Sequence, residues 1–79
     1  MQFPDVRPFR RAEASAYLRE RHGISRTPAT LASLAVRGGG PLFRKAGRIP
    51  LYTQADLDAW VAEITTEPVR TTSELRDDL

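Results

Sequence analysis

Small polar and basic side chains recur between residues 26 and 37, where one helix would present them on its outward side. A guanidinium group can pair with a phosphate or a guanine edge, and a short hydroxyl side chain can reach a base edge. Backbone N–H groups at the start of such a helix would form a cradle for a phosphate. Taken alone, this pattern also suits an ordinary solvated helix face. The candidate DNA contacts in this segment are Arg26, Thr27, Ala29, Thr30, Ser33 and Arg37.

A second basic group surrounds Gly47 and comprises Arg44, Lys45 and Arg48. On a narrow hairpin, such side chains can lie against the DNA backbone or enter a minor groove, where the potential is most negative. The alternative is a solubilised hairpin edge, because charges there discourage pairing with other strands. Three arginines nearer the N-terminus are further candidates for backbone contacts: Arg7, Arg10 and Arg11.

The distribution of charge along the chain favours a polyanionic partner, although the net charge is only +2. Residues 7–48 include ten basic and two acidic side chains, a net +8, whereas residues 49–79 include two basic and seven acidic ones, a net −5. Asp5 carries the remaining charge. Each phosphate that is neutralised releases condensed counterions, which favours binding. Charge bias alone fits a solvated arginine-rich surface equally well. The helices and strands that carry these residues must therefore distinguish a binding surface from a solvated one.

The first predicted helix covers residues 11–22, which are rich in helix formers. Ala14, Tyr17 and Leu18 fall on one side at spacings of three and four residues, and Arg21 could add its aliphatic stem. Gly23 follows the last turn, where glycine adopts the left-handed conformation at low cost. The helix is therefore expected to end there.

A second helix is predicted to begin at Pro28, with Thr27 as its cap. The glycine run at residues 38–40 ends this helix. No strand precedes the glycine run and no Lys-Ser or Lys-Thr follows it, so we interpret the run as a turn rather than a phosphate loop. The buried stripe of this helix consists of Leu31, Leu34 and Ala35.

Residues 42–52 predict a two-stranded hairpin with the basic residues near its tip. Pro50 cannot donate to a ladder, so its strand must be an open edge. Thr53 and Asp56 have the spacing of a capping box, which predicts a third helix with the apolar stripe Leu57, Trp60, Val61 and Ile64. The expected core includes Leu31, Phe43, Tyr52, Leu57 and Trp60.

Together these elements predict a mainly α domain with a small β-hairpin, the arrangement of a winged helix-turn-helix with three helices and a two-stranded wing. Seventy-nine residues suffice for one modest core. The expected organisation is a flexible N-terminal arm at residues 1–8, the DNA-binding domain at 9–65 and a mobile acidic tail at 66–79, with a brief helix at most over 73–79.

Several functional classes lack a candidate site in this sequence. There is no cysteine, which excludes disulfides and cysteine-ligated zinc, and His22 is the sole histidine. No nucleophile, base and orienting group occur in a pattern typical of catalysis, so we expect neither an enzyme nor a metal or cofactor. No apolar run approaches the roughly 20 residues that span a bilayer, and the first residues do not resemble a signal peptide, so the expected compartment is the cytoplasm, at the bacterial or phage nucleoid, with no membrane partner.

The sequence also resembles the excisionase and AlpA-like branch of the MerR superfamily over about residues 9–64. The more specific part of this resemblance is the segment from Tyr52 to Trp60, which is preceded by a Gly-Pro and a Gly-Arg pair. The residues that carry the resemblance are Glu13-Ala14-Ser15-Ala16-Tyr17-Leu18, Gly23-Ile24-Ser25, Ala29-Thr30-Leu31, Gly39-Gly40-Pro41, Phe43-Arg44-Lys45, Gly47-Arg48, Tyr52 and Asp56-Leu57-Asp58-Ala59-Trp60.

This resemblance implies a winged helix-turn-helix whose second helix enters the major groove of double-stranded DNA while the wing contacts the adjacent backbone or minor groove. It further implies an excisionase, or recombination directionality factor, that bends attachment-site DNA and biases a tyrosine or serine integrase toward excision of a mobile element. Because one small domain offers few base contacts, we expect cooperative self-association on DNA. The alternatives are a small phage or mobile-element transcriptional regulator and, less favoured, a protein-interaction adaptor whose basic surface binds an acidic partner.

Overall fold

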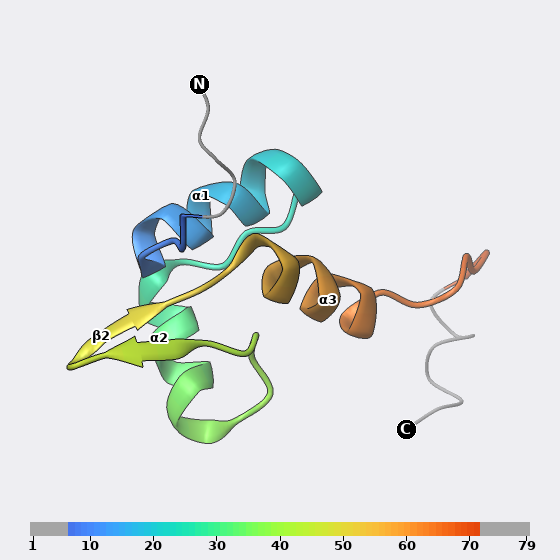
Figure 1. The fold of residues 1–79 in the computed structure, drawn as a ribbon. Coiled ribbons are helices and arrows are strands. Elements are labelled where there is room, and N and C mark those ends of the chain that lie inside the picture. The colour runs from blue at the N-terminus through green and yellow to red at the C-terminus, as the bar shows by residue number, and fades with distance from the viewer. Residues whose placement is uncertain (1–6, 72–79) are drawn as a thin grey trace.

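The computed structural model describes residues 7–71 and contains three helices and one β-hairpin (Figure 1). The predicted mainly helical fold with a two-stranded wing is confirmed, and its arrangement is that of a winged helix-turn-helix. Within the described residues, no helix is both long and apolar enough to cross a membrane. Residues 1–6 of the arm predicted at 1–8 and residues 72–79 of the tail predicted at 66–79 lie outside the described residues. In chain order the elements are α1 (Arg11–His22), α2 (Pro28–Arg37), β1 (Arg44–Ala46), β2 (Ile49–Leu51) and α3 (Gln54–Ile64).

Helix α1 begins without a capping hydroxyl or amide side chain, and Glu13 takes over part of that role. The Glu13 carboxylate accepts a hydrogen bond of 2.8 Å from the backbone N–H of Arg10, which precedes the helix. The helix ends at Gly23, whose φ of 72° lies in the left-handed region. The N–H of Ile24 then reaches back to the carbonyl of Leu18 at 3.0 Å, a Schellman-type ending that returns the chain toward the core.

Helix α2 has the boundaries that its sequence predicts. The Thr27 hydroxyl accepts the backbone N–H of Thr30 at 3.1 Å, and Pro28 occupies the first turn. Gly38 ends the helix with φ 91° and ψ 163°, a combination that essentially only glycine adopts. Helices α1 and α2 are joined by the short turn at residues 23–27 and pack against each other, as a helix-turn-helix requires.

The hairpin pairs β1 and β2 in antiparallel fashion, with Lys45 opposite Pro50. Its two-residue turn starts at Gly47, where φ is +65°, as a tight hairpin turn demands. Beyond β2, Phe9 and Tyr52 form an antiparallel bridge, with N–H···O distances of 2.6 and 2.8 Å. The residues just before α1 are thus attached to the same small β structure.

One core joins the three helices to the end of the hairpin. Leu31 of α2 and Tyr52 are each 1% exposed, and Trp60 of α3 is 4% exposed. The predicted core is confirmed, with Phe43 packed at its border. Ile64, which was expected on the buried stripe of α3, is 40% exposed because it lies in the last turn, beyond the reach of the core. The six core residues are Ala14, Leu18, Leu31, Tyr52, Leu57 and Trp60.

Candidate nucleic-acid interface

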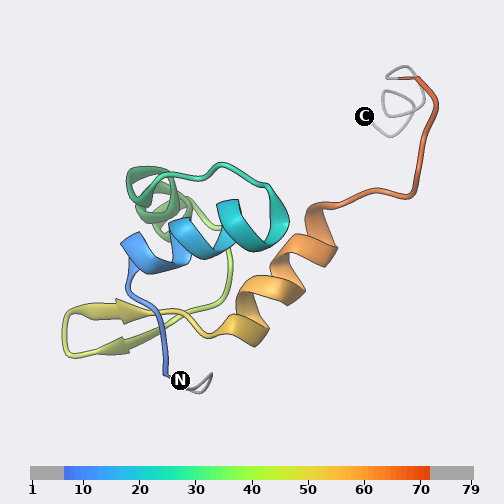
Figure 2. The same cartoon turned by 90° about the horizontal axis from the view of Figure 1, so that it is seen from above.

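A groove of about 250 Å³ lies between α2 and the hairpin, and three cationic side chains line it. Arg11 comes from the first turn of α1, while Lys45 and Arg48 come from the hairpin. The α2 wall is formed by Ala35 and Val36. The fold therefore gathers positive charge from residues that are up to 37 positions apart in sequence. Both views place α2 and the hairpin at the same end of the molecule (Figures 1 and 2).

Arg11 has a defined position in this groove because two aromatic rings and a hydroxyl group hold it. Its Nε donates a hydrogen bond of 3.0 Å to the Tyr52 hydroxyl. Its guanidinium carbon lies 5.8 Å from the ring centre of Phe43 and 6.0 Å from that of Tyr52, distances at which a cation is attracted to a π face. The two terminal nitrogens take no part in the bond to Tyr52, so they are available for a phosphate.

The hairpin presents its cations to two sides. Lys45 and Arg48 line the groove, whereas Arg44, the neighbour of Lys45 along β1, does not. Alternate residues of a strand point to opposite faces, which accounts for this division. All three side chains are exposed, so the alternation along the strand turns none of them into the core.

The outward side of α2 carries the residues that the sequence predicts. Ala29, Ser33, Val36 and Arg37 are exposed, and Thr30 is half-buried. The polar members are ordered by bonds within the helix: the Thr27 hydroxyl lies 3.0 Å from that of Thr30, and Arg37 Nε donates to Ser33 Oγ at 3.2 Å. Val36 was not among the predicted DNA contacts, although its spacing from Ala29 and Ser33 could have indicated it.

Arg26 lies apart from the cationic groove, although it belongs to the same predicted set. Its guanidinium carbon is 5.8 Å from the centre of the Trp60 ring, and one terminal nitrogen donates to the Ser25 carbonyl at 2.9 Å. The structure thus positions Arg26 near α3, before the first turn of α2, while Lys45 and Arg48 flank the last turn of that helix. No sequence pattern indicated the Trp60 contact, because 34 residues separate the two side chains.

The candidate arginines before α1 differ in how they are engaged. Arg7 forms an ion pair with Glu13 at 2.8 Å, while Arg10 is exposed. The hydrogen bond from Arg7 and the backbone N–H of Arg10 together hold the pKa of Glu13 below its ordinary value. Glu13 therefore stays ionised and neutralises part of the positive charge near the start of α1.

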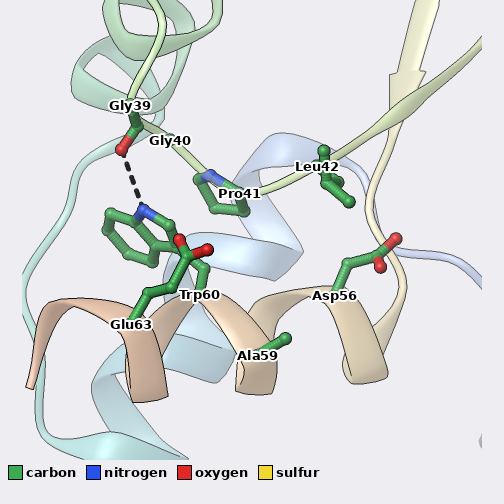
Figure 3. Close-up of a pocket in the computed structure, with 8 residues that line it drawn as sticks. All are labelled: Gly39, Gly40, Pro41, Leu42, Asp56, Ala59, Trp60 and Glu63. Atoms are coloured by element: carbon green, nitrogen blue, oxygen red, sulfur yellow. Dashed lines mark hydrogen bonds between the residues drawn. The ribbon is translucent and has the colours of Figure 1, made fainter.

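A second groove, lined by carboxylates, lies on the α3 side (Figure 3). Asp56 and Glu63 flank Ala59 on the helix, and the opposite wall is the loop at residues 39–42. The indole N–H of Trp60 donates to the Gly39 carbonyl at 2.9 Å, which fixes this loop to α3. No residue lines both this acidic groove and the cationic one, so Asp56 and Glu63 are separate from the three cations beside α2.

Sequence reasoning missed a polar cluster between α1 and α3. Asp58 Oδ1 accepts the Tyr17 hydroxyl at 2.7 Å and lies 2.7 Å from His22 Nε2, and Gln54 donates to the Tyr17 hydroxyl at 3.1 Å. Although partial burial works to raise the pKa of Asp58, the bonds from His22 and Tyr17 outweigh it and lower that pKa. At least 36 residues separate Asp58 from its partners on α1, so no local spacing could reveal the cluster.

Among residues 7–71, no group of three or more His, Cys, Asp or Glu side chains is arranged to hold a metal ion. Searches against known protein families, characterised proteins and solved structures each gave no match to this chain.

Proposed function

We propose that the chain binds double-stranded DNA with sequence preference, through α2 and the hairpin. The observation that carries this proposal is the groove beside α2, in which Arg11, Lys45 and Arg48 converge. Cations that neutralise phosphates release counterions, and this term supplies much of the affinity of DNA-binding proteins. The carboxylates of α3 lie on a separate groove, so a duplex held at the cationic groove avoids their repulsion.

The dimensions of α2 support the placement of this helix in the major groove. An α-helix with its side chains is about 10–12 Å across and the major groove is about 12 Å wide, so α2, whose ten residues extend about 15 Å, can lie within it. Ala29, Thr30 and Ser33 are short side chains, so the helix axis can approach the base edges closely. The hairpin would then lie along the neighbouring backbone, where Lys45 and Arg48 meet phosphates.

The test is a titration of labelled duplexes by fluorescence anisotropy at several salt concentrations. Lys45→Met and Arg48→Met should each reduce the slope of log K against log salt by about 0.9, the value expected for one lost phosphate contact. Arg19→Met is the matched control: Arg19 is exposed on the last turn of α1, outside the groove, and its replacement should leave the slope unchanged. A duplex that binds with no dependence on salt, or equal slopes for all variants, would contradict the proposal.

Sequence preference is tested separately with a preferred and a scrambled duplex. Thr30→Ala and Ser33→Ala should reduce the ratio of the two affinities, because they remove hydroxyls from the outward side of α2. Thr30→Ala leaves the helix cap in place, since the Thr27 hydroxyl accepts the backbone N–H of residue 30. Equal losses on both duplexes would assign these side chains to the phosphate backbone instead.

We further propose that the biological role is that of an excisionase, with an integrase as partner and with neighbouring copies cooperating on DNA. This finer proposal rests on the resemblance to the excisionase and AlpA-like branch. A transcriptional regulator would use the same interface, so the decisive experiment is an excision assay with a tyrosine or serine integrase, with and without the protein, together with a gel assay of DNA bending. Strong binding without bending or any effect on excision would favour the regulator.

A further inference from the structure

We infer that Val36 determines part of the sequence preference by contacting the 5-methyl group of a thymine in the major groove. This inference rests on the proposed function and names a residue that the sequence analysis had not included. Val36 is 88% exposed, the highest value among the exposed large apolar side chains of residues 7–71. It lies on the last turn of α2, where the helix forms one wall of the cationic groove.

The surroundings of Val36 distinguish it from an isolated surface valine. Arg11, Lys45 and Arg48 line the same groove, so a polyanion drawn to them would cover Val36 as well. A helix repeats every 3.6 residues, so Ala29, Ser33 and Val36 follow one another along one side of α2, and all three are exposed. The first two side chains are small, which allows this side of the helix to come close to the floor of a groove.

The chemistry of the major groove indicates which group of the DNA Val36 would contact. Among the base edges displayed there, the thymine methyl is the apolar group, and the other edges offer hydrogen-bond donors and acceptors. A valine in a helix has one strongly preferred χ1 rotamer, so its two methyl groups are already oriented and little entropy is lost on contact. Val36 lies beside Lys45 and Arg48 of the hairpin. The thymine that it contacts is therefore expected at the end of the binding site nearer to the hairpin.

The test begins with selection of the preferred site from a library of random-sequence duplexes. Each thymine of the selected duplex is then replaced by deoxyuridine, which removes only the 5-methyl group, and affinities are measured by anisotropy. At one position, this replacement should weaken binding of the wild-type protein about fourfold, as expected for the loss of one buried methyl group. Val36→Ala should bind the thymine and uracil duplexes equally, with the affinity of the wild type for uracil.

Leu42→Ala is the matched control, because Leu42 is 74% exposed but lies outside the cationic groove. It should retain the full methyl dependence. Neither replacement should lower the thermal midpoint, since both side chains are largely exposed and alanine favours the helix at position 36. Methyl dependence that is absent in the wild type, or unchanged in Val36→Ala, would overturn this inference alone. Failure to bind any duplex would overturn the proposed function, and the role of Val36 with it.

Discussion

Arg11 and Arg26, which the sequence predicted as a backbone contact and a recognition-helix contact, are held in different ways in the fold. Arg11 is held by the Tyr52 hydroxyl and two ring faces, and its terminal nitrogens are left at the groove. Arg26 covers Trp60 and bonds the carbonyl of the preceding residue. The guanidinium of Arg11 is thus positioned before any ligand arrives, which reduces the entropy lost when it binds a phosphate.

Asp58 gives a prediction for the dependence of stability on pH. Its pKa is lowered in the folded protein, so the stabilisation is present above the ordinary carboxyl value and is lost as pH falls through the folded value. Asp58→Asn keeps an acceptor oxygen for Tyr17 and His22 but removes the charge. We expect this variant to be less stable by up to about 1 kcal/mol at about pH 5, because the side chain is partly exposed. The difference should shrink steadily as the pH falls below about 4.

Urea unfolding followed by circular dichroism at several pH values measures this difference. Glu63→Gln is the control, since it also removes one carboxylate of α3 but lies on the side that faces the loop at residues 39–42. It should change the stability little at any pH. A deficit of Asp58→Asn that is constant from pH 5 to pH 2 would show that the charge is not what stabilises the contact between α1 and α3.

The loop after α2 is held by close packing as well as by the hydrogen bond from Trp60. A Cβ at Gly40 would lie 2.8 Å from the Cβ of Leu34, which cannot move without moving α2. We therefore expect Gly40→Ala to destabilise the protein by roughly 1–3 kcal/mol, the usual cost of overpacking. Displacement of the loop should also disturb the bond between the Trp60 indole and Gly39 and change the native fluorescence of this single tryptophan.

Gly47→Ala is the comparison for that experiment. Gly47 has φ of +65°, so alanine is strained there, but no atom lies within 4 Å of an added Cβ. This variant should lose some stability without any change in the native emission of Trp60, since the hairpin tip lies far from the loop in both views (Figures 1 and 2). Equal stability and emission in Gly40→Ala and the wild type would disprove the packing argument.

The elements were predicted more fully than the contacts between them. Thr27, Pro28, Gly23 and Gly38 are local signals, and they fix the ends of α1 and α2 because caps and left-handed turns depend on neighbouring residues alone. The position of Arg11 against Tyr52 depends on how the hairpin packs on α1, and this geometry has no local signature. For the same reason, the sequence predicted which basic residues are candidates. It did not predict which of them line the groove, which contacts Trp60 and which pairs with Glu13.

The two grooves carry opposite charge, so the electrostatic potential differs between them. The cationic groove lies between α2 and the hairpin, and the acidic groove lies between α3 and the loop at residues 39–42 (Figure 3). A polyanion is therefore steered toward the cationic groove before contact, a long-range effect that salt screens. Two consequences can be separated experimentally: net charge sets the rate of approach, and the residues of the groove set the number of phosphates bound.

Glu63→Lys and Lys45→Glu change the net charge by the same amount in opposite directions, one in each groove. Glu63→Lys should speed association at low salt, because the repulsion from α3 is removed, and leave the salt slope of equilibrium binding unchanged. Lys45→Glu should slow association and also reduce that slope by about 0.9, because a phosphate contact is lost. Stopped-flow association rates and equilibrium titrations across a range of salt concentrations measure both quantities. If the two variants instead produced equal and opposite changes in affinity and slope, binding would depend on the total charge of the protein. The groove beside α2 would then make no defined contacts with the phosphates of the duplex.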